Sequence, residues 1–207
     1  MIDNPLGVDH VLGLDETGGP LEPWLVRGAI GVIEAHMSER QDPRVIEYGS
    51  GSGTPWLCER AERAISVEHL APWAEKVSAL LDEMGLTNHR MIVEPLGDGY
   101  VMAIEEEGGP YDLVIVDGRL RVKCVRTAIN HVAPDGMLVL DNSERPYYKP
   151  AIDLLDGLGW ERSDFENSLW HTTIWRRSSD GLVEREDRRV DLAGGPCPTG
   201  AECDPVV

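Results

Sequence analysis

The stretch that decides the fold is RVIEYGSGSGTPWLC, residues 44–58. It begins as a short apolar run that ends near an acid, and it continues with glycines at three alternating positions, Gly49, Gly51 and Gly53. The apolar run is typical of a buried strand, and glycines allow dihedrals and close approaches that a Cβ would prevent. A helix that begins just after the third glycine would direct free N–H groups across the turn. The pattern predicts a strand, a tight turn containing Ser50 and a helix, with a ligand bound against the turn.

Glu47, immediately before this loop, indicates which ligand is suited. The dinucleotide fingerprint G-x-G-x-x-G would require a third glycine at position 54, where this chain has threonine. A carboxylate here would repel a pyrophosphate, whereas it can accept hydrogen bonds from an ammonium group. An NAD-dependent or nucleotide-sugar oxidoreductase is therefore disfavoured. A loop that only turns the chain is the alternative for this stretch alone.

A second acid ends the next expected strand, RAISVEH at residues 63–69. Glu68 lies 21 residues after Glu47. In a βαβ unit, an acid about 20 residues further on is placed to bind the two hydroxyls of a ribose. We therefore expect Glu68 to bind a ribose and His69 to lie beside the adenine. The alternatives are a solvated acid at a strand end and a surface histidine.

Three later strands are also followed by oxygen-bearing side chains, in the order Asp98, Asp117, and Asp141 with Asn142. The clearest of these strands, YDLVIVDG at residues 111–118, is a continuous apolar run of the parallel-sheet type. Because the carboxyl ends of parallel strands meet at one edge of a sheet, these side chains are expected to gather where ligands bind. Asp98 is a candidate acceptor of a hydrogen bond from an adenine amino group.

Between the expected strands, apolar residues recur at the three- and four-residue steps that are typical of helices. Helices are expected at 24–40, 55–62, 71–84, 100–107, 121–133 and 148–158, and strands at 45–48, 63–69, 89–96, 111–118, 137–140, 160–165 and 169–176. Trp24 and Trp73 are expected to pack in the core, and the alternative for Trp24 is that it forms the wall of a pocket. The alternation predicts an α/β, doubly wound, mostly parallel sheet with helices on both faces and an antiparallel hairpin at one edge.

The expected domain spans residues 23–177, after a loop or lid at 1–22 and before a charged, Gly/Pro-rich tail at 178–207. The formal net charge of −18, from 37 acidic and 19 basic residues, disfavours nucleic-acid and anionic-membrane partners. No apolar run reaches the roughly 20 residues of a membrane helix. We expect a cytoplasmic protein with free cysteines that acts on a small molecule, with a homodimer as one open option.

The stretch EYGSGSG resembles the E/D-x-G-x-G-x-G first motif of class I S-adenosylmethionine (SAM) dependent methyltransferases. The resemblance extends over residues 23–177 and includes the second-strand acid, YDLVIVDG and GMLVLDN. It implies a Rossmann-like sheet of seven strands with a reversed last strand, and SAM as the cofactor. The residues to which it assigns SAM binding are Glu47, Gly49, Ser50, Gly51, Gly53, Glu68, His69, Asp98 and Asp117.

Within this superfamily, Asp117, Asp141 and Asn142 resemble the Mg²⁺ ligands of catechol-type O-methyltransferases, and related acidic pairs occur in macrocin-type enzymes. The resemblance implies an Mg²⁺ ion that positions the acceptor oxygen, with Asp117 and Asp141 as catalytic residues. The alternative is that Asp117 faces the methionine end of SAM and that Asp141 and Asn142 cap the following loop. The lysine base of the catechol-type enzymes is replaced by Leu120. The candidate bases are therefore Lys123, His69, His171 and Glu144.

The expected reaction is the in-line transfer of a methyl group from the SAM sulfonium to an oxygen of a small molecule. One alternative is a metal-independent N-methyltransferase in which Asp117 or Asp141 orients an amine of a small molecule or peptide. Another is a non-catalytic subunit with the same fold that scaffolds a partner. Acids at consecutive strand ends favour an enzyme over this last option.

Overall fold

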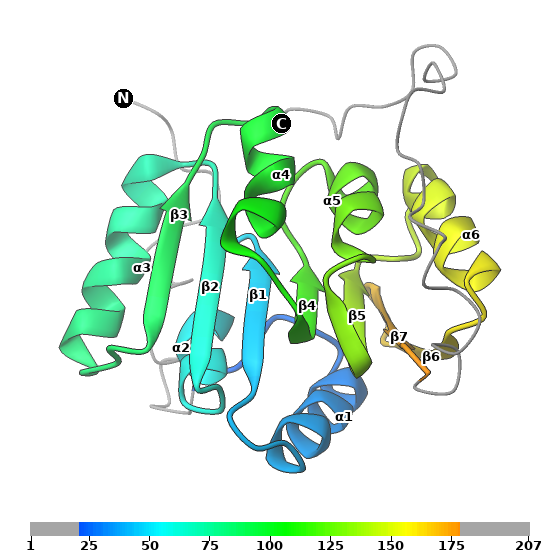
Figure 1. Cartoon of the computed structure of the whole chain (residues 1–207), viewed down its shortest axis with the longest axis horizontal. Helices are drawn as coiled ribbons and strands as arrows, with labels where there is room; N and C mark the ends of the chain where they lie inside the picture. Colours follow the sequence, from blue (N-terminus) through cyan, green and yellow to red (C-terminus); the bar gives the residue numbers. More distant parts are fainter. Residues whose placement is uncertain (1–20, 179–207) are drawn as a thin grey trace.

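A seven-stranded sheet organises the chain in the computed structural model, which describes residues 21–178 (Figure 1). The strand order is β3-β2-β1-β4-β5-β7-β6. Strands β3, β2, β1, β4 and β5 run parallel, whereas β7 runs antiparallel to both β5 and β6. The strands are β1 (Arg44–Tyr48), β2 (Arg63–Glu68), β3 (His89–Val93), β4 (Tyr111–Val116), β5 (Val132–Asp141), β6 (Glu161–Glu166) and β7 (His171–Arg176). The predicted fold class is confirmed.

Helices cover both faces of the sheet (Figure 1). Within residues 21–178 they are α1 (Arg27–Ser38), α2 (Gly53–Cys58), α3 (Ala71–Glu83), α4 (Asp98–Glu107), α5 (Arg121–Ala128) and α6 (Lys149–Gly157), with a short 3₁₀ helix at Pro146–Tyr148. Helices α4, α5 and α6 pack on one face, and α1, α2 and α3 pack on the other. The sheet is therefore doubly wound, as its alternating sequence predicts.

Strands β1 and β4 lie in the middle of the sheet because their side chains are apolar on both faces. In β1, Ile46 and Tyr48 belong to the core on one face, and Val45 belongs to the core on the other. The same alternation occurs in β4, with Val114 and Leu113 on opposite faces. The loops that follow β1 and β4 consequently emerge side by side at the carboxyl edge of the sheet.

The first expected helix begins later than its periodicity suggests. Helix α1 starts at Arg27, because Val26 is extended and its N–H donates to Thr172 Oγ1 at 3.0 Å. Trp24 therefore precedes the helix, and its side chain is 62% exposed. The prediction that Trp24 packs in the core is wrong. Trp73 is half-buried, and its Nε1–H donates to the Ser50 carbonyl at 2.8 Å.

The helix expected at 121–133 is also shorter, since α5 ends at Ala128 and β5 already begins at Val132. Val132 pairs with Tyr111, and the register then shifts so that Met137 pairs with Leu113. The turn residues 134–136 thus form an irregular part of one long strand rather than a link between helix and strand. Apolar residues at 132 and 133 continue the helical period, which explains the wrong boundary.

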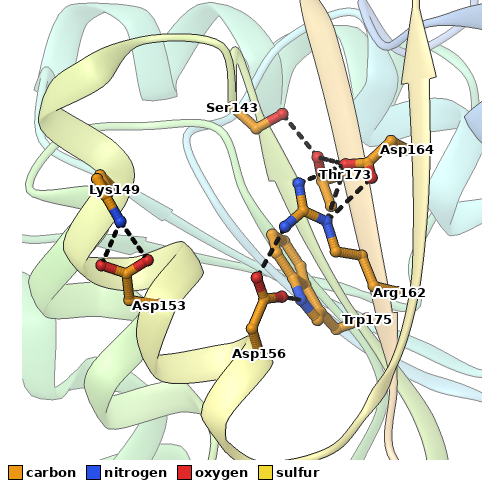
Figure 2. Close-up of polar contacts among 8 residues, drawn as sticks. All are labelled: Ser143, Lys149, Asp153, Asp156, Arg162, Asp164, Thr173 and Trp175. Carbon is orange, nitrogen blue, oxygen red and sulfur yellow. Dashed lines mark hydrogen bonds and ion pairs between the residues drawn. The ribbon is translucent and has the colours of Figure 1, made fainter.

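A polar network fastens the hairpin of β6 and β7 to α6 (Figure 2). The Arg162 guanidinium contacts Asp156 at 2.8 Å and Asp164 at 2.9 Å, and it lies 5.5 Å from the ring centre of Trp175. Trp175 Nε1–H donates to Asp156, and Thr173 Oγ1–H donates to Asp164, both at 2.8 Å. The antiparallel edge is therefore held by charged hydrogen bonds as well as by the sheet.

Most of the expected lid at 1–22 and almost all of the expected tail at 178–207 lie outside the described residues. In residues 21–178, no helix is both long and apolar enough to cross a membrane.

Candidate functional site

A cavity of about 160 Å³ lies at the carboxyl ends of β1 and β4. Its walls include the glycine loop (residues 49–53), Glu47, Asp117 and the two tryptophans Trp24 and Trp73. This is the switch point of the sheet, because β1 lies between β2 and β4. The structure therefore brings together these residues predicted to bind the cofactor: Glu47, Gly49, Ser50, Gly51, Gly53 and Asp117.

The glycine loop touches the loop after β4 at a point where no side chain fits. Gly49 has a φ of +94°, and a Cβ there would lie 2.8 Å from the Gly118 Cα. A Cβ on Gly118 would in turn meet the Tyr100 hydroxyl, which accepts a hydrogen bond from the Arg119 N–H at 3.3 Å. Gly51, by contrast, faces open space. The floor of the site is thus backbone against backbone, with room above Gly51.

Glu47 is a buried acid, 6% exposed, at the end of β1. Its Oε1 accepts hydrogen bonds from Thr54 Oγ1 at 2.6 Å and from Ser66 Oγ at 2.5 Å. Burial raises the pKa of Glu47 to about 7, and the nearby charges of Asp117 and Glu68 add to this effect. No cationic side chain within residues 21–178 forms an ion pair with Glu47. A cationic group of a ligand is therefore the natural partner of this carboxylate.

Glu68 is 3% exposed and is already hydrogen-bonded within the chain. Oε2 accepts from the Ser50 N–H and Oγ, both at 3.1 Å, and Oε1 accepts from the N–H groups of His69 and Leu70 at 2.7 and 2.9 Å. The His69 ring Nδ1 lies 2.8 Å from Oε1. Glu68 thus ties the glycine loop to the end of β2. Ribose binding by Glu68 stays a prediction, and it requires a ribose hydroxyl to replace one of these donors.

His69 and Asp98 lie away from the cavity wall. The His69 ring is held by Glu68 and lies edge-on to Tyr100, with 6.2 Å between the ring centres. Asp98 is exposed and is the first residue of α4, where its charge suits the positive end of the helix dipole. The roles proposed for both residues beside the adenine stay predictions.

A buried arginine joins the ends of β4 and β5. Arg121 is 6% exposed, and its guanidinium donates to the carbonyls of Gly118, Asp141 and Asp117 at 2.9, 2.6 and 2.7 Å. The same group lies 3.0 Å from the Asp117 carboxylate and faces the Tyr148 ring at 5.3 Å. The sequence alone does not predict this role of Arg121, because Arg121 lies four positions after Asp117 and its side chain reaches Asp117 and Asp141 only once α5 is folded.

The Asp141 carboxylate points toward β7. Its Oδ1 accepts a 2.6 Å hydrogen bond from Thr172 Oγ1, which in turn accepts the Val26 N–H. Burial, together with the charge of Asp117, raises the pKa of Asp141 to about 7. Asn142 follows with a left-handed φ of 51°. Asp141 therefore anchors the entrance to α1 through Thr172.

These contacts do not fit the Mg²⁺ site expected from Asp117, Asp141 and Asn142. The Asp117 carboxylate pairs with Arg121, and that of Asp141 accepts the Thr172 hydroxyl. No group of three or more His, Cys, Asp or Glu side chains among the described residues is arranged to hold a metal ion. Of the candidate bases, Lys123 is exposed on α5, and Glu144 accepts the His171 N–H at 2.8 Å. Neither lines the cavity.

Curated proteins with similar sequences are protein-L-isoaspartate O-methyltransferases. That of Methanoculleus marisnigri is 30% identical over 110 residues, which cover 52% of this chain and 46% of that protein. That of Syntrophus aciditrophicus is 28% identical over 116 residues, which cover 55% of this chain and 46% of that protein. The chain thus spans about half the length of these relatives. No protein-family model matches it.

Three of the solved structures with the same fold are named as methyltransferases. The O-methyltransferase TomG of Streptomyces achromogenes, in complex with SAM, superposes with a TM-score of 0.58 at 18% identity, covering 71% of this chain and 78% of that one. A SAM-dependent O-methyltransferase of Thermotoga maritima superposes with a TM-score of 0.60 at 11% identity, and the match covers 73% of this chain and 65% of that one. Precorrin-6y C5,15-methyltransferase of Geobacter metallireducens superposes with a TM-score of 0.58 at 12% identity, and the match covers 80% of this chain and 97% of that one.

The sheet order, the glycine loop after β1 and the cavity at the switch point define a Rossmann-like methyltransferase fold. Over about half of its length the chain is also similar in sequence to curated methyltransferases, so both comparisons support the expected resemblance to the class I SAM-dependent methyltransferase superfamily.

Proposed function

We propose that the chain transfers a methyl group from SAM to a carboxylate oxygen of a peptide. The sulfonium carbon–sulfur bond breaks as the oxygen–carbon bond forms, the sulfur keeps the electron pair, and a methyl ester and S-adenosylhomocysteine leave the site. A small-molecule oxygen, as the sequence alone suggests, is the alternative acceptor.

Cofactor binding is supported by the character of the cavity. Glu47 is buried, hydrogen-bonded through one oxygen and without a cationic partner in residues 21–178, so that it suits the ammonium group of SAM. The open space above Gly51 lets a ligand approach the loop backbone. Trp24 and Trp73 provide apolar walls.

The observation that carries the choice of acceptor lies at the ends of β4 and β5. A hydroxyl acceptor needs a base or a metal ion to remove its proton. Here Arg121 pairs with one oxygen of Asp117, and Thr172 donates to one oxygen of Asp141. Leu120 replaces the catechol-type lysine, and Lys123 is exposed. A carboxylate is already ionised at neutral pH and requires neither. Positioning by the protein is then sufficient.

The names of the relatives support a peptide acceptor, since they methylate isoaspartate in proteins. An anionic acceptor also needs a cation nearby in a chain of net charge −18. Arg145, 42% exposed, follows β5, lies 3.7 Å from the Glu144 carboxylate and donates to the Tyr147 hydroxyl at 3.2 Å. Its positive charge opposes the effect of burial on the pKa of Asp117, which supports Arg145 as a cation within electrostatic reach of the cavity wall. We assign the recognition of the acceptor carboxylate to Arg145.

The test uses SAM with a radioactive methyl group and two synthetic peptides of one sequence, carrying either isoaspartate or aspartate at one position. Catechol serves as the small-molecule acceptor, and each reaction runs with Mg²⁺ and with excess chelator. We expect base-labile label on the isoaspartyl peptide only, at the same rate in both conditions. The Glu47→Gln variant should lose transfer, and Glu83→Gln, an exposed change on α3, should retain it.

Label on catechol that depends on Mg²⁺ would contradict the carboxylate proposal and restore the metal-assisted one. Absence of label on every acceptor from a chain that binds SAM would reject the acceptor assignment while leaving the cofactor assignment intact.

A further inference from the structure

A hydrogen-bonded chain of three side chains crosses β1, β2 and β3, which lie next to one another in the sheet (Figure 1). His89 Nε2, at the start of β3, lies 2.8 Å from Ser66 Oγ in β2. Ser66 Oγ lies 2.5 Å from Glu47 Oε1 in β1. The chain thus connects the cofactor cavity with a residue on the opposite, amino-terminal side of the sheet.

The number of available protons fixes the direction of these bonds when Glu47 is ionised. A carboxylate only accepts, so the single hydroxyl proton of Ser66 goes to Glu47. Ser66 must then accept from His89, whose Nε2 carries the proton of the neutral ring. Thr54 donates its own hydroxyl proton to the same Oε1 and accepts the Gly51 N–H at 2.9 Å. Each of the bonds that link His89, Ser66, Thr54 and Glu47 Oε1 therefore has one donor and one acceptor.

His89 is suited to remain neutral and fixed. Burial lowers the pKa of His89 to about 4, so the ring is uncharged at neutral pH. One side of the ring borders a surface hollow at the amino ends of the strands, where the charged neighbours are Asp42, Arg44, Glu62, Arg63 and Arg90. Ser66 itself is 1% exposed. Water therefore does not compete for the hydroxyl of Ser66.

The charged and titratable groups that act on Glu47 are Asp117 after β4, Glu68 at the end of β2 and Cys58 in α2. The two carboxylates oppose the ionised form of Glu47, and burial opposes it further. Among residues 21–178, the hydroxyls of Ser66 and Thr54 favour it. The direction in which the Ser66 hydroxyl points is consequently decisive for the charge in the cavity.

We propose that His89 is a positioning residue for the cofactor cavity: its Nε2–H orients the Ser66 hydroxyl, which stabilises the ionised form of the Glu47 carboxylate for a cationic ligand group. Hydrogen bonds in series strengthen one another, so the ring acts on Glu47 without touching it. The use of this charge to hold SAM rests on the proposed function, whereas the link from His89 to Glu47 exists in the ligand-free chain.

The test is a carbon NMR titration of Glu47 in the ligand-free full chain, with the glutamate carboxyl carbons labelled and the Glu47 signal assigned through Glu47→Gln. Ser66→Ala should raise the pKa of Glu47 by about 1 to 2 pH units, because a hydrogen bond to the charged form is lost. His89→Met should raise it by about 0.2 to 0.6, the share expected from cooperative strengthening. His89→Gln, which retains an N–H donor, should restore most of this difference.

The double variant decides whether His89 acts through Ser66. In the Ser66→Ala background, His89→Met should change the pKa of Glu47 by less than about 0.2. His131→Met is the matched control, since His131 is also half-buried but pairs with Glu105 at 4.0 Å, and it should leave Glu47 unchanged. An unchanged Glu47 titration in His89→Met, or an equal shift in both backgrounds, would overturn the proposal.

Titration of the same variants with S-adenosylhomocysteine separates this inference from the proposed function. If the link holds and the ligand binds, the pH below which affinity falls should follow the pKa of Glu47 in each variant. If the NMR shifts occur without any binding of this ligand, the role of His89 stands and the cofactor assignment fails.

Discussion

Replacing Glu47 by Gln should make the folded chain more stable while removing cofactor binding. The acid has a pKa of about 7 in the fold against an ordinary value of 4.5. Ionising it in the folded state therefore costs about 3 kcal/mol. The neutral amide oxygen of glutamine can still accept from Thr54 and Ser66.

The stability difference between the Glu47→Gln variant and the wild type depends on pH, because the pKa of Glu47 differs between the folded and the unfolded chain. Below about pH 4.5, Glu47 is protonated in both the folded and the unfolded chain, so the substitution should change little. Between about pH 4.5 and 7 the unfolded chain ionises this acid while the folded chain keeps it protonated, so the wild-type chain loses stability progressively, and above about pH 7 the loss is complete. At pH 8 the Glu47→Gln variant should exceed the wild type by up to about 3 kcal/mol, or roughly 6 to 12 °C in melting temperature.

Urea unfolding between pH 4 and pH 8 measures this difference, and Glu83→Gln, which changes an exposed acid, is the control. In the same variant SAM affinity should fall about 10- to 100-fold, because a charged hydrogen bond to the ammonium group is lost. An equal gain at pH 4 and pH 8, or no gain at pH 8, would refute the assignment of Glu47 as a buried, unpaired acid.

Asp141→Asn should be more stable than the wild type by a margin that grows between pH 5 and pH 8, since the buried acid has a pKa of about 7, and urea unfolding measures this margin. The same variant should still bind SAM in a calorimetric titration. Arg121→Met should lower the free energy of unfolding in urea by about 3 to 5 kcal/mol, because the Asp117 carboxylate and three carbonyls lose a buried charged donor. A decrease of less than about 1 kcal/mol would contradict the role of Arg121 in joining the ends of β4 and β5. Arg162→Ala should cost about 1 kcal/mol by thermal unfolding without changing SAM affinity. Arg145→Gln should raise the KM for a carboxylate acceptor about tenfold with little change for SAM in steady-state kinetics.

The sequence predicts the sheet well because its strands are short apolar runs that end on acids. The runs at 111–118 and 44–48 could only be buried centrally, and the glycine loop follows directly, so the cavity with Glu47 and Asp117 is where the pattern places it. Helix boundaries were harder. Apolar residues at 132 and 133 satisfy a helical period and a strand equally, and only pairing with Tyr111 decides between them.

Side-chain partners were the least predictable part of the site. An acid at a strand end has the same appearance in sequence whether it lines a cavity, as Glu47 does, or ties two loops together, as Glu68 does through Ser50. The metal interpretation depended on two carboxylates meeting, and Arg121 becomes their neighbour only when α5 packs against the ends of β4 and β5. Trp24 looked apolar and helical, but the chain there is extended.

Calorimetric titration of the full chain with SAM and with NAD, each in Mg²⁺ and in excess chelator, tests the central claim most directly. Glu47 before a G-x-G-x-G loop predicts that SAM binds with one affinity in both conditions and that NAD produces no binding heat. Binding of NAD, or no binding of SAM in either condition, would contradict the assignment of this cavity to SAM.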